Sequence, residues 1–282
     1  MKNKIKYYVI GFLINSLLIF NIGAFEQFEF NVTEIEILEN GNKIKGLNRG
    51  KISSNNGVVI TADTFVYNKT LNQLIANGNV KIEDNLTKCI IFANDILYFK
   101  KEEKIKATGK VKIIDDKKQT ITSDKIEFNK KLNQINAKGN VKIENKINKY
   151  IVFAEDISYL KNKEKILTKG KSQAIIEKKY NIYSEDIEFD TSEKKIKSNK
   201  KTKIINNNNQ VINLDKFYFS INENEIRGEN ILLVTDFGSP KIDKFFFSSA
   251  ILNLNKNTFI AKNTEIKIHK TIFDNSENDP RI

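Results

Sequence analysis

The chain has 282 residues, a formal net charge of +12 and a composition rich in Lys, Asn and Ile, with one Cys and one His. A single cysteine excludes an intrachain disulfide, and a single histidine argues against a His-based metal site or catalytic triad. The lysines are spread along the chain and alternate with apolar residues, without a dense basic block. The charge therefore predicts solvated strand faces and argues against a nucleic-acid partner.

Residues 1–24 have the pattern of an export signal. Lys2, Lys4 and Lys6 precede an apolar stretch that runs to residue 22, and Gly23-Ala24 offers small residues for cleavage. The uncharged run that contains this stretch also fits a retained N-terminal membrane anchor. With either outcome, we expect the rest of the chain to lie outside the cytoplasm.

From residue 25 to 270 the sequence predicts about eight tandem units of roughly 30 residues. The tract Ile60-Thr61-Ala62-Asp63-Thr64-Phe65-Val66-Tyr67 returns as Ile91-Phe92-Ala93-Asn94-Asp95-Ile96-Leu97-Tyr98. The position of Ala62 in each unit is held by Val32, Ala62, Ala93, Ser123, Ala154, Ser184, Leu214 and Ser249. The last interval is longer and contains the turn signal Gly238-Ser239-Pro240. Such a repeat indicates one supersecondary unit that is stacked many times.

Each unit reads as a bent strand, a tight turn and a second strand. Relative to the small anchor, apolar residues fall at −2, 0, +3 and +5, and the step of three predicts a β-bulge or sheet corner. Strict alternation from +12 to +20 predicts a half-buried second strand. Turn residues such as Asn68-Lys69 and Asn129-Lys130 separate the halves. The predicted fold is all-β, with about 16 antiparallel strands in an elongated, bent β-jelly-roll of stacked hairpins.

Acidic residues recur beside the bulge in six units, which is typical of a scaffold position, because an active site normally occurs once. We expect Asp63, Asp124 and Asp215 to accept backbone N–H groups that the bulge leaves unpaired. The sequence contains no P-loop, G-x-S-x-G or H-E-x-x-H motif. We therefore predict no catalytic residues, no metal site, no cofactor and no enzymatic activity.

Two interpretations of the shared apolar face stay open at the level of the pattern. One is an ordinary filled core. The other is a groove for long apolar chains, in which each methylene removed from water contributes ~0.8 kcal/mol. The stack also ends in unpaired strand edges, which can accept another sheet by β-augmentation.

The tract Ile-x-Ala-Asp-x-Phe-x-Tyr, followed by Ala-x-Gly-Asn-Val-x-Ile, resembles the repeat of the OstA-like lipopolysaccharide-transport family, over about residues 30–270. That family includes LptA, the periplasmic domain of LptC and the N-terminal domain of LptD. The resemblance implies a β-jelly-roll bridge that carries lipopolysaccharide across the periplasm, with acyl chains inside and neighbouring jelly-rolls joined through edge strands.

The C-terminal residues resemble one member of this family most. The segment 265–269, followed by Asn278-Asp279-Pro280-Arg281, looks like the junction of LptD, so residues 271–282 are expected to lead toward an outer-membrane barrel. The disulfides of that family between domain and barrel are not supported, because Cys89 has no partner. The alternatives are a free LptA-like bridge or an anchored LptC-like protein.

The resemblance also implies partners, a location and a site. The partners are lipopolysaccharide, other jelly-roll proteins of the bridge, and the outer-membrane barrel or its lipoprotein partner; the location is the periplasm, in association with the outer membrane. Lysines near the rim would favour phosphorylated sugar head groups. The rival interpretation is a structural surface or adhesin stalk with a filled core. The predicted lipid-binding groove is lined by Ile60, Phe65, Tyr67, Ile91, Tyr98, Ile121, Phe128, Tyr159, Phe189, Phe217 and Phe219.

Overall fold

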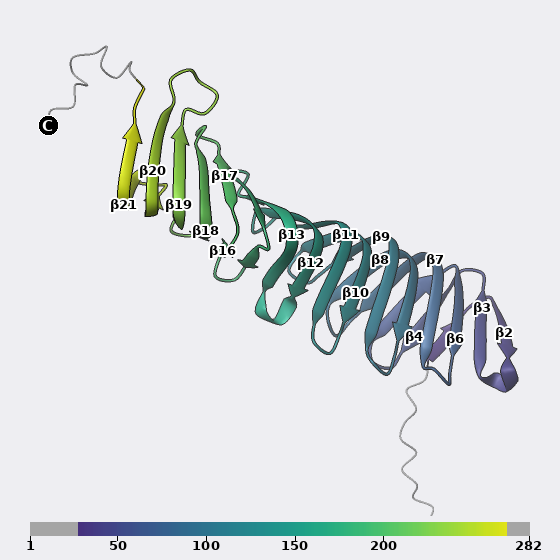
Figure 1. The fold of residues 1–282 in the computed structure, drawn as a ribbon. Coiled ribbons are helices and arrows are strands. Elements are labelled where there is room, and N and C mark those ends of the chain that lie inside the picture. Colours follow the sequence, from purple (N-terminus) through teal and green to yellow (C-terminus); the bar gives the residue numbers. More distant parts are fainter. Residues whose placement is uncertain (1–27, 270–282) are drawn as a thin grey trace, which may run out of the picture.

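The computed structural model describes residues 28–269, which form one continuous antiparallel sheet of 21 strand segments. Five strands are each divided in two at a bend, so the segments make sixteen bent strands, two for each of the eight predicted units. The strands lie side by side in chain order along an elongated stack, from β2 at one end to β21 at the other (Figure 1). The predicted all-β fold of stacked antiparallel hairpins is confirmed. The proposed signal peptide or anchor and the C-terminal junction lie outside the described residues.

Three of the five divided strands come first. They are β1 (Phe28–Asn31) with β2 (Glu34–Leu38), β3 (Lys43–Leu47) with β4 (Gly50–Ser54), and β5 (Val58–Ala62) with β6 (Thr64–Asn68). The unbroken bent strands are β7 (Gln73–Asp84), β8 (Cys89–Phe99), β9 (Lys104–Ile114), β10 (Gln119–Asn129), β11 (Gln134–Asn145), β12 (Tyr150–Leu160) and β13 (Lys165–Ile176). The rest are β14 (Tyr180–Glu185) with β15 (Glu188–Asp190), β16 (Lys195–Ser198) with β17 (Thr202–Asn206), β18 (Val211–Ser220), β19 (Glu225–Thr235), β20 (Asp243–Asn253) and β21 (Thr258–Lys267); short 3₁₀ turns η1 (Glu39–Gly41) and η2 (Lys161–Lys163) complete the set.

The bend divides the sheet into two walls. Wall 1 contains β1, β4, β5, β14 and β17 and the matching arms of the longer strands, and wall 2 contains β2, β3, β6, β15 and β16 with the other arms. The turns between units lie at the rim of wall 1, and the turns within units lie at the rim of wall 2. We call the line along which these two rims approach each other the mouth.

The bend lies where the sequence breaks its alternation. The β10–β11 register shifts between Thr122 and Lys125, and the β7–β8 register shifts between Asn77 and Val80. At Gly78 the backbone takes φ +76°, and an added Cβ would lie 2.4 Å from an oxygen of Asp63. Glycine is favoured there because other residues adopt this region with strain. The bulge restores the same apolar face on both sides of the bend, so both walls are apolar toward each other.

Turn chemistry fixes the hairpins within units as predicted. The side-chain oxygen of Asn68 accepts the backbone N–H of Leu71 at 3.0 Å, and that of Asn129 accepts the N–H of Leu132 at 3.1 Å. The residue that closes each of these turns, Asn72 or Asn133, has a left-handed φ of 51°. These side chains satisfy turn donors that no strand partner reaches. The pairing of each strand with its sequence neighbour follows from such short connections.

Candidate lipid-contacting interior and its mouth

All the predicted groove residues face the space between the walls and are buried. The aliphatic members Ile60, Ile91 and Ile121 lie on wall 1, and the aromatic members lie on wall 2. The side chains of Phe65, Tyr98 and Phe128 are 0% exposed. The other aromatic members of the predicted groove, also buried, are Tyr67, Tyr159, Phe189, Phe217 and Phe219. The arrangement puts a continuous apolar surface on each wall, and contact of these residues with lipid stays a prediction.

The interior of the middle of the stack is filled. A channel wide enough for water would leave its lining exposed, whereas the residues that line both walls from β5 to β18 are almost fully buried. Their contacts join one continuous core cluster that includes both walls. Burying each such side chain is worth about 1.5–3 kcal/mol. In this conformation the middle is therefore a hydrophobic core, as in the filled-core interpretation.

A second aromatic set, which the sequence pattern did not reveal, closes part of the mouth from wall 1. Phe28 meets Tyr67 with ring centroids 4.9 Å apart, and Tyr150 meets Phe189 at 5.0 Å. Tyr180 meets Phe219 in the same edge-on geometry at 5.0 Å. These rings start their strands at the rim of wall 1 and reach across to wall 2. The repeat offsets concealed them, because Val58, Cys89, Gln119 and Gln210 hold the same position, four residues before the anchor, in other units.

Between the aromatic contacts, charged residues close the mouth. The Lys130 ammonium lies 3.0 Å from a carboxylate oxygen of Asp84, and the two side chains are only 4% and 0% exposed. The Lys161 ammonium donates to the carbonyl of Thr87 at 2.9 Å and lies 3.4 Å from Asp116. Each lysine comes from the rim of wall 2, and each partner lies at the rim of wall 1. The lysines therefore tie the two walls together.

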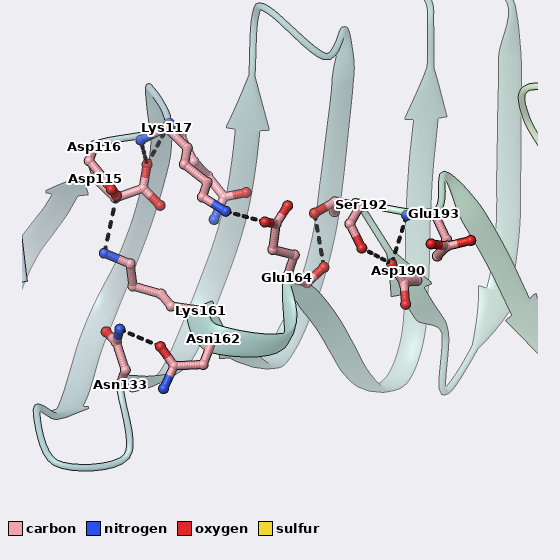
Figure 2. A network of polar contacts seen from close by, with 12 residues as sticks. Asp115, Asp116, Lys117, Asn133, Lys161, Asn162, Glu164, Asp190, Ser192 and Glu193 are labelled. Carbon is pink, nitrogen blue, oxygen red and sulfur yellow. Dashed lines mark hydrogen bonds and ion pairs between the residues drawn. The ribbon is translucent and has the colours of Figure 1, made fainter.

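The polar contacts continue along the mouth, as Figure 2 shows. Lys117 on the rim of wall 1 pairs with Glu164 on the rim of wall 2. Asn133 and Asn162, on successive turns of wall 2, are joined at 2.8 Å. Further along the stack, Tyr180 donates from wall 1 to Asn224 of wall 2 at 3.1 Å.

Burial shifts the ionisation of groups in this part of the interior. It raises the pKa of the Asp115 carboxyl and the pKa of the Cys89 thiol, because a charged form loses water there. Burial likewise raises the pKa of Tyr150 and Tyr159. The Cys89 sulfur lies 3.3 Å from the Lys161 ammonium. A buried thiol with a raised pKa is a poor nucleophile at neutral pH, so Cys89 acts as a small core residue.

The bulge acids do not bond as we expected. Asp63 accepts from the side-chain amide of Asn79 at 2.8 Å, and Asp124 accepts from that of Asn140 at 2.9 Å. Asp215 accepts from the side-chain amide of Asn230 at 3.0 Å. The prediction of backbone N–H donors for these three residues is wrong. In the first two units the asparagine directly after the bulge glycine points its side-chain amide back at the acid, and in the third unit Asn230 does so. The hydrogen bond from Asn79, with Arg49 beside it, lowers the pKa of Asp63.

The C-terminal end of the interior is open. Phe259 and Ile266 belong to the inward face of β21 and are 39% and 45% exposed. A pocket of about 240 Å³ opens between the walls there, below the roughly 300 Å³ at which pockets for drug-sized ligands begin. Its apolar lining comes from Leu233, Phe245, Leu252, Leu254 and Phe259.

Two observations bear on other kinds of site. Over residues 28–269, no group of three or more His, Cys, Asp or Glu side chains is arranged to hold a metal ion. Over the same residues, none of the helices has the length and apolarity that a membrane crossing requires.

Comparison with known proteins gives a distant likeness in fold. No family model matches the sequence, and no curated protein matches it. A solved structure that the fold resembles is that of LptH from Pseudomonas aeruginosa, described as the LptA homologous periplasmic component of the conserved lipopolysaccharide transport device. The two chains share 12% identity over 43% of this chain and 95% of that chain, with a TM-score of 0.39. A likeness at this level carries no argument about function.

Proposed function

We propose that the chain is a lipopolysaccharide-transport component of the OstA-like type, which shelters acyl chains between its two walls and passes the lipid toward the outer membrane. The observation that carries the proposal is one apolar interior that runs the length of the stack and is exposed where the stack ends. The repeated motif that resembles this family supports it independently. The periplasm, in association with the outer membrane, is the location that follows.

Lipid entry requires the walls to part. The interior of the middle is filled in this conformation, so acyl chains would replace contacts between the walls and would not enter an existing channel. The exposed residues of β21 offer a first contact, and each methylene that leaves water there contributes ~0.8 kcal/mol. The mouth, whose contacts are partly polar and made by turns, is the natural line of opening.

The two ends of the described stack offer edges to partners. β21 pairs only with β20 among the described strands, and β1 and β2 pair only with β4 and β3. Inward apolar residues at the first strand are also exposed, among them Ile35 and Ile37. An edge strand beside an apolar face suits addition of another jelly-roll, which would extend both sheet and interior. Other bridge proteins, and the outer-membrane barrel or its lipoprotein partner, are the partners proposed. The same ends serve a domain like that of LptD, a free LptA-like bridge and an anchored LptC-like protein.

A structural stalk is the second candidate, and the filled middle favours it. Photocrosslinking distinguishes the two. A benzophenone amino acid at Phe128 or Phe259, inside the interior, is expected to crosslink to lipopolysaccharide. The control position is Phe92, which lies on the outer face of β8, opposite Lys81 and Lys112. Circular dichroism would verify that each variant is folded. Folded variants that crosslink at neither interior position, or that crosslink equally at Phe92, would favour the stalk.

A further inference from the structure

In part of the mouth, charged side chains bridge the two walls, whereas aromatic rings bridge them in other parts. Tyr150 and Tyr180 bridge the walls from the strand-start position of wall 1, but Cys89 and Gln119 hold that position in two earlier units. The Lys161 ammonium occupies the space beside Cys89, at 3.3 Å from its sulfur. Lys130 and Asp84 meet in the same stretch of the mouth.

The fold does not require lysine at these turn positions. The backbone N–H groups of Lys130 and Lys161 donate to the carbonyl oxygens of Glu103 and Asn133 in the preceding turns of wall 2. Thr191 and Ile221 make the same backbone contact in later units and are also buried. An uncharged side chain therefore fits this position, and the buried ammonium groups have another reason to be there.

The fold does not require acids on the opposite rim either. One oxygen of Asp84 accepts the N–H groups of Leu86 and Thr87. Asn145 holds the equivalent turn with the same kind of bonds, at 3.0 Å to Ile147 and 2.9 Å to Asn148, and Asn206 does so in a later unit. Asparagine is sufficient for the turn, so the charge of Asp84 serves its contact with Lys130.

Buried polar atoms that lack a hydrogen-bond partner gather in this same stretch. They include one oxygen of Asp115, the amide nitrogen of Gln119 and the amide oxygen of Asn133. Gln119 is 2% exposed and Asp115 is 5% exposed. Unpaired buried polar groups lower the stability of the fold, and such a cost is typical of a site whose polar groups act on a ligand.

We propose that Lys130 and Lys161 form an anion site in the mouth, which takes the phosphate group of a lipid whose apolar chains lie between the walls. The inference rests on the proposed function and adds the chemistry of the head group. Asp84 and Asp116 hold the two ammonium groups while the mouth is closed. When the walls part, phosphate replaces the carboxylates, and the lysines remain at the boundary between the apolar interior and water. Two lysines 31 positions apart, on successive turns of one rim, suit an extended phosphorylated head group.

Binding of two matched lipids tests the site. The probes are lipid A with both phosphates and the same lipid after enzymatic removal of the phosphates, titrated against the full chain. The test variant is Asp84→Asn with Lys130→Met, which removes the buried pair without leaving one charge unpaired. The control is Lys131→Met, which removes one lysine from an exposed position next to Lys130. Thermal melting would verify that each variant is folded.

We expect the double variant to bind phosphorylated lipid A about tenfold more weakly, the scale of one charge-assisted hydrogen bond, with its affinity for the dephosphorylated lipid unchanged. Asp84→Asn alone releases Lys130 from its carboxylate and is expected to bind phosphorylated lipid A more tightly, a result that a purely structural pair would not give. A third arm, competition by short-chain phosphatidylglycerol, identifies the source. Effective competition would assign the site to phospholipid phosphate as well, and its absence would assign it to sugar phosphate.

Three results would overturn the site. If the chain binds both forms of lipid A equally well, the anion site is wrong and the proposed function survives. If Lys131→Met weakens binding as much as the double variant, the effect does not depend on the buried pair and the site is also wrong. If the wild-type chain binds neither lipid, the proposed function fails together with the site.

Discussion

The middle of the stack and its C-terminal end carry the same alternating pattern but reach different states. In the middle, Phe128 has a strand on each side and the opposite wall in front of it, and it is 0% exposed. At the end, Phe259 belongs to the corresponding apolar face of β21, has a neighbouring strand on one side only within residues 28–269, and is 39% exposed. One apolar pattern therefore gives a closed core or an accessible surface, according to the neighbours that the stack supplies. The proposed lipid path needs both, a stable middle that opens along its mouth and an end that is already accessible.

Thiol accessibility should show the largest difference between the two regions. Cys89 is buried in the middle, and burial raises the pKa of its thiol. A Cys89→Ser/Ile266→Cys variant carries its thiol on the inward face of the open end instead. Because a buried thiol reacts only when the structure opens, we expect alkylation of Cys89 to be slower by on the order of a thousandfold. Mass spectrometry after timed iodoacetamide treatment measures both rates, and similar rates would mean that the middle opens as easily as the end.

Aromatic truncation should give the next largest difference. Phe128→Ala is expected to cost about 4 kcal/mol of unfolding free energy, because it leaves a cavity between the walls. Phe259→Ala removes the same ring from a partly exposed site and is expected to cost less than about 1.5 kcal/mol. Urea denaturation followed by circular dichroism gives both values. Equal costs would show that β21 is as well packed as the middle.

The buried pair in the mouth offers a smaller effect of defined sign. Lys130→Met leaves the carboxylate of Asp84 buried without its cation, and we expect a loss of about 3 kcal/mol. Adding Asp84→Asn removes the stranded charge and should recover most of the loss, since Asn145 and Asn206 hold the equivalent turns. The same denaturation assay measures the recovery. If the double variant is no more stable than Lys130→Met, the two residues are not coupled.

The smallest effect concerns Asp115 and depends on pH. Burial raises the pKa of its carboxyl above the ordinary value of 3.8, so the folded chain holds that proton more tightly than the unfolded chain. The ionised form therefore lowers stability above the folded pKa, and this cost disappears as pH falls below 3.8. Asp115→Asn is expected to be more stable at neutral pH by on the order of 1 kcal/mol or less, with the advantage vanishing in acid. Melting temperatures measured from about pH 3 to about pH 8, a range that includes the ordinary carboxyl pKa, test this. An advantage of Asp115→Asn that grows in acid would contradict it.

The sequence pattern predicted the bend and the apolar faces correctly because both are local. A step of three between apolar positions forces the bulge, and the small anchors Ala62 and Ala93 are buried at that bend. Contacts across the mouth were not predictable in the same way. Phe28 and Tyr67 come from different strands and meet only when the two rims approach. In the sequence, Lys130 resembled any lysine in a turn. The only signal that its position is buried was that Thr191 and Ile221 hold the equivalent position in later units.

The sequence by itself determined the hairpin repeat, the position of the bulge and the side of each strand that is apolar, because these depend on alternation and turn chemistry over a few residues. Only the tertiary structure decided how far the walls close, which residues bridge the mouth, and where the apolar face stays exposed. The reason is physical. Burial of a side chain depends on what lies opposite it, and the opposite wall is set by the angle of the bend and the stagger of the rims, which no single repeat encodes. The charged stretch of the mouth is the clearest example, since Asp84 and Lys130 are more than one unit apart in sequence and become partners only in the folded stack.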